Sequence, residues 1–302
     1  MKIIECPLCS EKKYNVLYRS TLTAHDTNTN KISQSLLNTL DKSQKHGQYV
    51  KCESCSLVYV NPPEDLRLLI AGYKNVVDKT YLSTEKYRKK LSQSHLSKIM
   101  KYKKGNSILD VGCFAGFFLE LAKQSGWKIV HGIEPSTWAK MIAKGRGIEI
   151  VGETIQSAKL KKSFYDVITL WDVIEHLPNP DETIDILKTS LKKNGIIAIG
   201  TPDIESPIAK ILKERYPYLV RMHIILYSRK TLRYLLEKHG FRVLYTKSYG
   251  RTFPVSYIID RIPFNDGLFG EIKKRLTSIK ILQKLSFTLN IGDSFIMIAQ
   301  RK

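Results

Sequence analysis

Short apolar runs alternate with amphipathic stretches from residue 106 onward. Each run has the length of a strand buried on both faces, and each is followed by apolar residues at helical spacing. The expected strands are "SILDVG" (107–112), "WKIVHGIEP" (127–135), "IEIVGE" (148–153), "YDVITLWD" (165–172) and "GIIAIGTP" (195–202). Strands that alternate with helices through short connections predict a parallel, doubly wound α/β sheet.

Helical spacing of apolar residues predicts the helices that connect these strands. A helix near 84–103 precedes the first strand, and Ser83 is suited to cap its amino terminus. Ser136 is placed in the same way before the helix that follows the second strand. Further helices are expected over 116–126, where a glycine ends the pattern, and over 180–195.

The first part of the chain has a different pattern, in which cysteines come in two pairs at the same spacing. The pairs "CPLC" and "CESC" contain Cys6, Cys9, Cys52 and Cys55. Four thiolates make a closed tetrahedral set, which predicts a structural zinc site. Paired thiols or disulfides without a metal are the alternative, although disulfides are rare in the cytoplasm. The β-rich run around the second pair ends at Pro62 and Pro63, so a domain boundary is expected near residue 65.

Composition adds a strong positive charge to this picture. The chain has 302 residues and a formal net charge of +21, which favours nucleic acid, an anionic membrane surface or phosphorylated substrates as partners. Lysines on solvated helix faces explain the same charge without any partner. No apolar run approaches the ~18 residues of a membrane span, and the amino terminus lacks the apolar core of a signal peptide. We therefore expect a cytoplasmic protein.

Acidic residues follow the ends of the predicted strands, where α/β sheets bind their ligands. In chain order they are Asp110, Glu134, Glu153, Asp172 and Glu175, with His176 beside the last. A carboxylate about 20 residues after a glycine turn suits the two hydroxyls of a ribose, as in NAD or S-adenosylmethionine.

The glycine loop decides between these two cofactors. A dinucleotide needs the spacing G-x-G-x-x-G, because its diphosphate packs on bare backbone. Here Gly112 and Gly116 are separated by a segment that contains Phe114, and Asp110 stands in front. An acid at that place suits a cationic amino group better than a diphosphate. The loop therefore favours S-adenosylmethionine, which has an ammonium and a sulfonium but no phosphate.

Four motifs in this order carry a family resemblance. "ILDVGCFAGFFLELA", "GIEPS", "FYDVITLWDVIEHLPNP" and "LKKNGIIAIGTP" resemble class I S-adenosylmethionine-dependent methyltransferases. The whole chain is most similar to enzymes with an amino-terminal zinc knuckle, which resemble ubiquinone-type methyltransferases at "EHL" and often accompany glycan or lipid assembly. The resemblance implies a Rossmann-like seven-stranded sheet of order 3-2-1-4-5-7-6, whose antiparallel last strand is 294–300 and whose sixth is 241–250. It also implies a zinc-ribbon domain over 1–65 and a methyltransferase domain over 66–302, with an acceptor-binding insertion at about 203–226.

The same resemblance implies a role for each cofactor residue. Asp110, Gly112 and Gly116 would hold the methionine end, and Asp172 and Val173 would border it. The ribose and adenine would lie against Glu134, Pro135 and Glu153. Phe114 departs from the family pattern, which has a glycine there, and we expect an ordinary negative φ with the ring pointing away from the cofactor.

Two histidines are candidates for the chemistry. His176 is the first candidate for the base that takes a proton from a hydroxyl acceptor, with His223 as the second. The alternatives are that His176 and Glu175 only brace their loop and that His223 is a packed structural histidine. The resemblance to ubiquinone-type enzymes also implies that Asp172, Glu175 and His176 could hold Mg²⁺.

The acceptor pocket is expected in the insertion after the fifth strand. From 207 to 251 there are 11 Lys and Arg against 2 Asp and Glu, together with several tyrosines. This mixture favours an anionic acceptor such as a nucleotide sugar or a lipid-linked sugar. Tyr73 and Tyr81 either form a lid or pack in the core. The segment 251–287 either packs on the sheet or lies on the inner face of the membrane.

These observations lead to one main hypothesis and two alternatives. The main hypothesis is a methyltransferase that uses S-adenosylmethionine to O-methylate a sugar or lipid-linked intermediate of surface-glycan or cell-envelope biosynthesis. An RNA methyltransferase would suit the charge, although no basic-aromatic RNA-binding module is evident. A non-catalytic scaffold built on the zinc knuckle is the third possibility, and the intact cofactor motifs argue against it.

Overall fold

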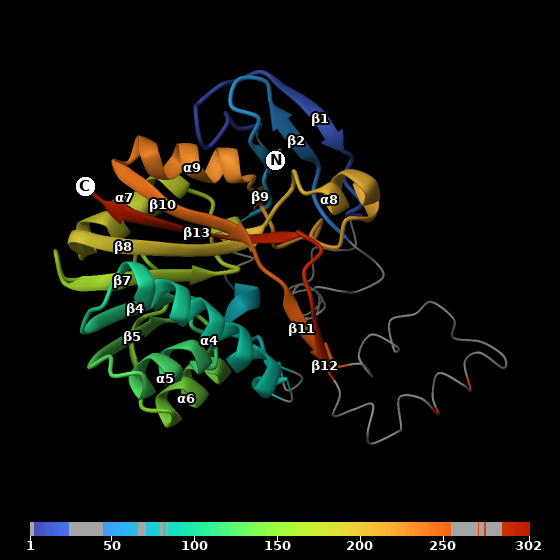
Figure 1. Cartoon of the computed structure of the whole chain (residues 1–302). Coiled ribbons are helices and arrows are strands. Elements are labelled where there is room, and N and C mark those ends of the chain that lie inside the picture. Colours follow the sequence, from blue (N-terminus) through green and yellow to red (C-terminus); the bar gives the residue numbers. More distant parts are fainter. Residues whose placement is uncertain are drawn as a thin grey trace.

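The computed structural model describes residues 3–23, 45–65, 71–78, 81–82, 84–254, 271, 275 and 286–302. Within these ranges the chain forms a large sheet covered by helices on both faces, and a smaller sheet packs beside it (Figure 1). The helices are α4 (Glu85–Tyr102), α5 (Phe117–Gln124), α6 (Thr137–Gly145), α7 (Pro180–Ser190), α8 (Pro207–Leu212) and α9 (Arg229–Lys238), with short 3-10 turns η2 (Ile174–His176) and η3 (Lys213–Arg215).

The large sheet has the strand order β10-β13-β8-β7-β4-β5-β6 among the described residues. Its strands are β4 (Ser107–Val111), β5 (Ile129–Ile133), β6 (Glu149–Gly152), β7 (Tyr165–Trp171), β8 (Leu191–Pro202), β10 (Phe241–Ser248) and β13 (Ser294–Arg301). Strand β13 is antiparallel to both of its neighbours, whereas the pairs from β8 to β6 are parallel. Read from β6, this is the predicted order 3-2-1-4-5-7-6, so the predicted fold is confirmed.

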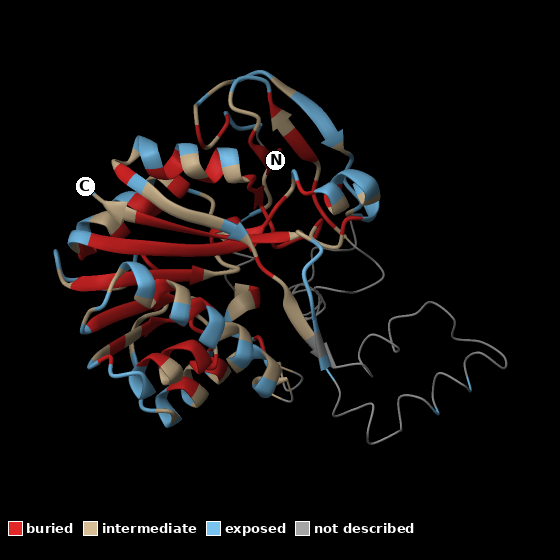
Figure 2. Ribbon diagram, viewed as in Figure 1, coloured by how far each residue is buried: buried red, intermediate tan, exposed pale blue. Residues whose placement is uncertain are grey.

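Alternate residues of the central strands face two separate helix layers. Ile108 and Val167 pack with residues of α4, α5 and α6. Leu109 and Ile168 point the other way and pack with residues of α7 and α9. This alternation follows from the period of two along a strand. Figure 2 shows the result, buried strands between helices whose outer faces are exposed.

The smaller sheet combines the amino-terminal segment with one strand from the insertion. Its order is β1 (Tyr14–Tyr18), β2 (Tyr49–Cys52), β3 (Val58–Val60) and β9 (Ile225–Leu226). Leu8 and Leu57 also share one apolar cluster with residues of β7, α7 and α9. The segment before residue 65 therefore packs into the larger part of the chain, and a boundary at that residue stays a prediction.

Helix ends differ in places from the sequence-based expectation. Ser136 caps α6 as predicted, with its side chain accepting a hydrogen bond from the Ala139 amide. Helix α7 ends at Ser190, five residues before the expected end, because Leu191 pairs with Tyr165 and already belongs to β8. The expected cap Ser83 lies outside the described residues.

The chain after β10 forms a small ribbon at the end of the large sheet. Strands β11 (Arg251–Pro254) and β12 (Ser286–Leu289) pair antiparallel. Most of the segment 251–287, the predicted membrane-surface candidate, lies outside the described residues. In the part of the chain that the structure describes, every helix is too short or too polar to cross a bilayer.

Candidate cofactor and acceptor site

Asp110 lies at the carboxyl end of β4 and is buried. Its Oδ1 accepts a hydrogen bond of 2.6 Å from the Thr169 hydroxyl on β7. Burial raises the pKa of Asp110 to about 8, because desolvation disfavours its charged form. A cationic group beside Asp110 would lower this pKa again and restore the negative charge of the carboxylate. This is the behaviour expected of a carboxylate that binds an ammonium group.

The two glycines of the loop allow the backbone to approach its neighbours closely. Gly112 and Gly116 have φ values of 71° and 79°, in the left-handed region. A Cβ on Gly112 would lie 2.5 Å from Cγ2 of Val173, which follows β7. A Cβ on Gly116 would lie 3.3 Å from Cα of Ala143 in α6. The loop is therefore packed between the ends of β4 and β7 on one side and helix α6 on the other.

Glu134 ends β5 and holds the glycine loop from the opposite side. Its Oε2 accepts a hydrogen bond of 2.8 Å from the Phe114 amide, and its Oε1 accepts one of 2.8 Å from the Ser136 amide. Burial raises its pKa to about 7. Each carboxylate oxygen keeps a second lone pair, so two ribose hydroxyls can still donate to Glu134. A contact between the half-buried Pro135 and adenine stays a prediction.

Phe114 corrects one expectation, because its φ is +46° rather than negative. This conformation is costly for a bulky residue, on the order of 1–3 kcal/mol. It directs the Phe114 amide at Glu134, and the ring packs against Tyr81 at 4.3 Å and Trp138 at 5.8 Å between ring centroids. The sequence held a signal for this positive φ, because the family pattern has a glycine at this position.

Residues 71–78 and 81–82 cross the carboxyl edge of the parallel strands. They contact the loops after β4, β5, β6 and β7 through the pairs Tyr81–Phe114, Val76–Ser136, Lys74–Glu153 and Tyr73–His176. Ion pairs with Lys140 and Lys74 lower the pKa of the exposed Glu153 to about 2. The segment thus lies over this edge of the sheet, while Tyr73 also packs against the core, so the lid and core-packing alternatives both remain predictions.

Asp172 follows β7 with a φ of +53°. Its Oδ1 accepts a hydrogen bond of 2.9 Å from the guanidinium of Arg251, and the Tyr249 hydroxyl lies 3.4 Å away. The sequence analysis missed Arg251 as a site residue, because it comes from β11, far along the chain. Other basic residues of this region pair elsewhere, such as Arg221 with Glu64.

Three potential proton-transfer groups meet beside Asp172. Glu175 is 1% exposed, and the Thr201 hydroxyl donates to its Oε2 at 3.0 Å. Among the described residues its Oε1 has no hydrogen-bond partner. Burial and the nearby negative charge of Asp172 raise the pKa of Glu175 to about 8. The rings of His176 and His223 lie next to this carboxyl, 4.8 Å apart between centroids.

Both imidazoles are held by backbone carbonyls. His176 Nδ1 lies 2.9 Å from the Met222 carbonyl oxygen, and His223 Nδ1 lies 2.8 Å from that of Tyr218. A carbonyl oxygen can only accept, so Nδ1 of His223 carries the hydrogen and its Nε2 keeps the lone pair. Nδ1 of His176 also lies 3.0 Å from the Tyr73 hydroxyl. Burial lowers the pKa of both histidines, which keeps them neutral at pH 7.

The expected Mg²⁺ ligand set is corrected by this geometry. Ligand atoms of Glu175, His176 and His223 lie within 4.8 Å of one another, and Asp172 is outside this group within the described ranges. The reason is the ion pair that holds the Asp172 carboxylate at Arg251. His223 therefore stands where Asp172 was expected, and two imidazoles suit a transition metal better than Mg²⁺.

The four cysteines of the amino-terminal segment meet as predicted. Their Sγ atoms lie within 4.8 Å of one another, and the contacts Cys6–Cys55 and Cys9–Cys52 are both 3.5 Å. A tetrahedral zinc site with bonds of about 2.3 Å has sulfurs about 3.8 Å apart, so the cluster fits zinc. The hydrogen bond with Cys55 and the amides of Leu8 and Cys9 lower the pKa of Cys6 to about 5, which favours the thiolate form.

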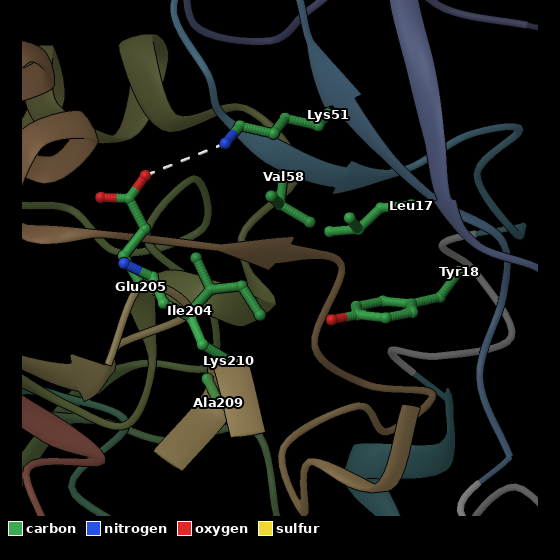
Figure 3. A pocket seen from close by; sticks show the side chains of 8 residues that line it. All are labelled: Leu17, Tyr18, Lys51, Val58, Ile204, Glu205, Ala209 and Lys210. Carbon is green, nitrogen blue, oxygen red and sulfur yellow. Dashed lines mark ion pairs between the residues drawn. The ribbon is translucent and has the colours of Figure 1, made fainter. Parts of the chain in front are cut away.

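A separate cavity of about 240 Å³ lies between the small sheet and α8 (Figure 3). Its walls carry Leu17, Val58, Ile204 and other apolar side chains, and Lys51 reaches across to Glu205. Four of its lining residues, Ile204, Glu205, Ala209 and Lys210, belong to the insertion that was expected to bind the acceptor, but it contains none of the expected cofactor residues and neither candidate histidine.

Comparison with known proteins gives relatives at low identity. A family described as a methyltransferase domain matches residues 84–246. A ubiquinone biosynthesis O-methyltransferase of Haemophilus ducreyi is 32% identical over 108 residues, 32% of this chain and 45% of that protein. Its counterpart in Salmonella typhimurium is 32% identical over 103 residues, 32% of this chain and 43% of the relative. The matched region thus spans less than half the length of these relatives.

Solved structures share the fold. A methyltransferase of Archaeoglobus fulgidus that depends on S-adenosylmethionine has a TM-score of 0.50 at 22% identity, over 74% of this chain and 100% of that chain. One of Thermotoga maritima, described as a possible histamine N-methyltransferase, has a TM-score of 0.50 at 17% identity, over 74% and 94%. Because the family match covers more than half of the 302 residues and the sheet has the expected order, this chain belongs to the methyltransferase-domain family, with the class I fold that uses S-adenosylmethionine.

Proposed function

We propose that this protein transfers the methyl group of S-adenosylmethionine to a hydroxyl of a sugar or lipid-linked intermediate of surface-glycan or cell-envelope assembly. The observation that carries the proposal is the meeting of two kinds of groups at one sheet edge. The buried carboxylates of Asp110 and Glu134 line the cofactor loop, and the neutral imidazoles of His176 and His223 lie beside Asp172, which follows the adjacent strand.

The cofactor would supply an electrophilic methyl group on a cationic sulfur. Asp110 would bind its ammonium, and Glu134 would accept hydrogen bonds from the ribose hydroxyls. Gly112 and Gly116 let the loop pack closely against Val173 and helix α6, and so set the path of its backbone. Residues 71–78 and 81–82 cross the carboxyl edge of the parallel strands and would exclude water from the cofactor site there. Exclusion of water helps to position the reacting groups. Positioning of this kind can supply about 7–11 kcal/mol of the barrier.

A hydroxyl acceptor must lose its proton as it attacks. The imidazole of His176 or His223 would take that proton, and general base catalysis of this kind contributes about 10²–10⁴-fold. The unpartnered Oε1 of Glu175 can accept or donate a hydrogen bond to a neighbouring hydroxyl of the same acceptor. The O-methyltransferase names of the relatives from Haemophilus and Salmonella support oxygen as the methylated atom.

The acceptor class is supported by the side chains around the histidines. Glu175 supplies a carboxyl group, which can bind sugar hydroxyls. Tyr218 and Tyr249 supply aromatic rings, which can pack on the face of a sugar. Arg251 brings a positive charge to Asp172 at this end of the sheet and suits an anionic group on the acceptor, such as the phosphate of a nucleotide sugar. Zinc held by the four cysteines would have a structural role, since four sulfurs close its coordination shell.

The test has a binding arm and a transfer arm. Calorimetry should show binding of S-adenosylmethionine by the wild type and at least tenfold weaker binding by Glu134→Ala. Methyl-labelled cofactor should label nucleotide sugars or lipid-linked sugars, and His176→Asn or His223→Asn should lose most of this transfer without losing cofactor binding. His239→Gln, at the residue that follows α9, is the matched control. Label on bulk ribosomal RNA instead would favour the RNA alternative, and no cofactor binding would contradict the enzyme.

A further inference from the structure

The small sheet holds the backbone around His223. The hydroxyl of Tyr49, the first residue of β2, lies 2.6 Å from the carbonyl oxygen of His223 and 3.0 Å from that of Val220. Tyr49 is fully buried. Its hydroxyl therefore contacts the backbone of the loop that carries the candidate base His223.

The neighbouring strand continues this link to the second histidine. The amide of Val60 in β3 donates to the Ile224 carbonyl at 2.9 Å, and the Ile224 amide donates to the Glu175 carbonyl at 3.0 Å. Ile224 follows His223 directly, and Glu175 precedes His176. A chain of backbone hydrogen bonds thus runs from the small sheet to both imidazole-bearing residues.

An ion pair and an apolar cluster complete the attachment. Arg221 donates to both carboxylate oxygens of Glu64, at 3.0 and 2.9 Å from its Nε, and both side chains are largely buried. Tyr216 and Leu219 of the insertion pack in one cluster with Tyr49 and with the apolar residues of β3. The amino-terminal segment therefore helps to fix the loop that bears His223, together with the hydrogen bonds of Tyr216 and Tyr218 to Asp293.

This attachment matters because the loop has little secondary structure of its own. Between η3 and β9 it makes turns, and β9 is only two residues long. Few ladder hydrogen bonds are available to fix it, so its position depends on side-chain contacts, those with the small sheet among them. A shift of about 1 Å in a catalytic group can cost about 100-fold in rate.

We propose that Tyr49 is a positioning residue, through which the cysteine-bearing amino-terminal sheet sets the place of His223 in the acceptor site. The inference rests on the proposed function for the catalytic meaning of His223, but the placement itself can be measured without an acceptor. The amino-terminal segment then contributes to catalysis through its contacts with the loop that bears His223.

The decisive variant is Tyr49→Phe, which removes the hydroxyl and keeps the ring. NMR of histidine-labelled protein, with His223 assigned through His223→Asn, should show changed imidazole shifts for His223 in Tyr49→Phe. The Kd for S-adenosylmethionine should stay within twofold. On a labelled acceptor, kcat should fall about 10- to 100-fold while the KM for the cofactor stays unchanged.

Tyr227→Phe is the matched control. Tyr227 is as deeply buried as Tyr49, but its hydroxyl has no hydrogen-bond partner among the described residues. The His223 shifts and kcat should therefore stay at the wild-type values in this variant. If Tyr49→Phe does not fold, Glu64→Gln tests the same loop through Arg221, and it should also move the His223 shifts.

Unchanged His223 shifts in folded Tyr49→Phe, or in folded Glu64→Gln where the first does not fold, would overturn the proposal. The same holds if Tyr227→Phe has an effect as large as that of Tyr49→Phe. If the wild type methylates no acceptor, the proposed function fails, and the NMR comparison still decides whether Tyr49 places His223.

Discussion

The amide of Phe114 donates a hydrogen bond of 2.8 Å to the carboxylate of Glu134, and it does so from a left-handed backbone conformation. The residue that departs from the glycine pattern therefore keeps the backbone geometry that glycine would have. What it adds is a ring that packs against Tyr81 in the segment over the cofactor edge. The loop is thus tied to its cover by an aromatic side chain.

Substitution of Phe114 separates these two contributions. Phe114→Gly relieves the backbone strain and removes the ring, and we expect less than a tenfold change in cofactor affinity, about 1.4 kcal/mol. Phe114→Ala keeps the strain and also loses the ring, so it should be less stable than Phe114→Gly. Calorimetry with S-adenosylmethionine and thermal unfolding measure both effects. A Phe114→Gly variant that binds no cofactor would show that the ring is part of the cofactor pocket.

Cofactor binding should depend on pH through the buried carboxyls. Without a cation, burial raises the pKa of Asp110 to about 8 and of Glu134 to about 7. At pH 7 Asp110 is therefore mostly protonated, and it must release its proton to pair with the ammonium. We expect affinity to weaken as pH falls from 8.5 to 6, by up to about tenfold per pH unit for each ionisation.

The same titration predicts proton release on binding at pH 7. Calorimetry in buffers of different ionisation enthalpy measures it directly. Asp110→Asn should bind more weakly and with less proton release. Equal affinity of the wild type at pH 6 and pH 8.5 would show that Asp110 does not bind the cationic end of the cofactor.

The cysteine cluster should bind one zinc ion per chain. Cys52→Ser should lose the metal and lower the unfolding temperature, because metal binding contributes to folding in such sites. Metal analysis of purified protein gives the stoichiometry. Cys113→Ser is the control, since Cys113 lies in the cofactor loop, and it should keep the metal. If wild-type protein from cells grown with excess zinc contains no zinc, the predicted zinc site is wrong.

The ion pair between Arg251 and Asp172 should affect the acceptor more than the cofactor. Arg251→Gln leaves the Asp172 carboxylate without its counter-charge at the acceptor end of the site. We expect a higher KM for the acceptor, with a cost in unfolding free energy of at most about 1 kcal/mol because both side chains are partly exposed. Arg251→Lys should recover part of the effect. Steady-state kinetics with a labelled acceptor measure it, and an unchanged acceptor KM would contradict the assignment.

Local patterns in the sequence predict the elements, and contacts between distant segments decide much of the site. The parallel strands, the order of the sheet and the cysteine cluster follow from apolar periodicity, family motifs and pair spacing. Arg251 could not be placed at Asp172 from the sequence, because β10 and the ribbon bring it there. The possible metal-ligand group contains His223, rather than the expected Asp172, together with Glu175 and His176. The sequence could not predict this either, because His223 is brought there by the pairing of β9 with β3.

Strand β9 also limits how freely this protein can be rearranged. The small sheet draws its last strand from beyond the cofactor-binding half of the chain, so the amino-terminal segment leaves the ribosome long before its own sheet can be completed. A hybrid that takes residues 1–65 from another methyltransferase would have to take the matching insertion as well. The amino-terminal strands and β9 must therefore match each other in any such hybrid, although most of the methyltransferase sequence separates them.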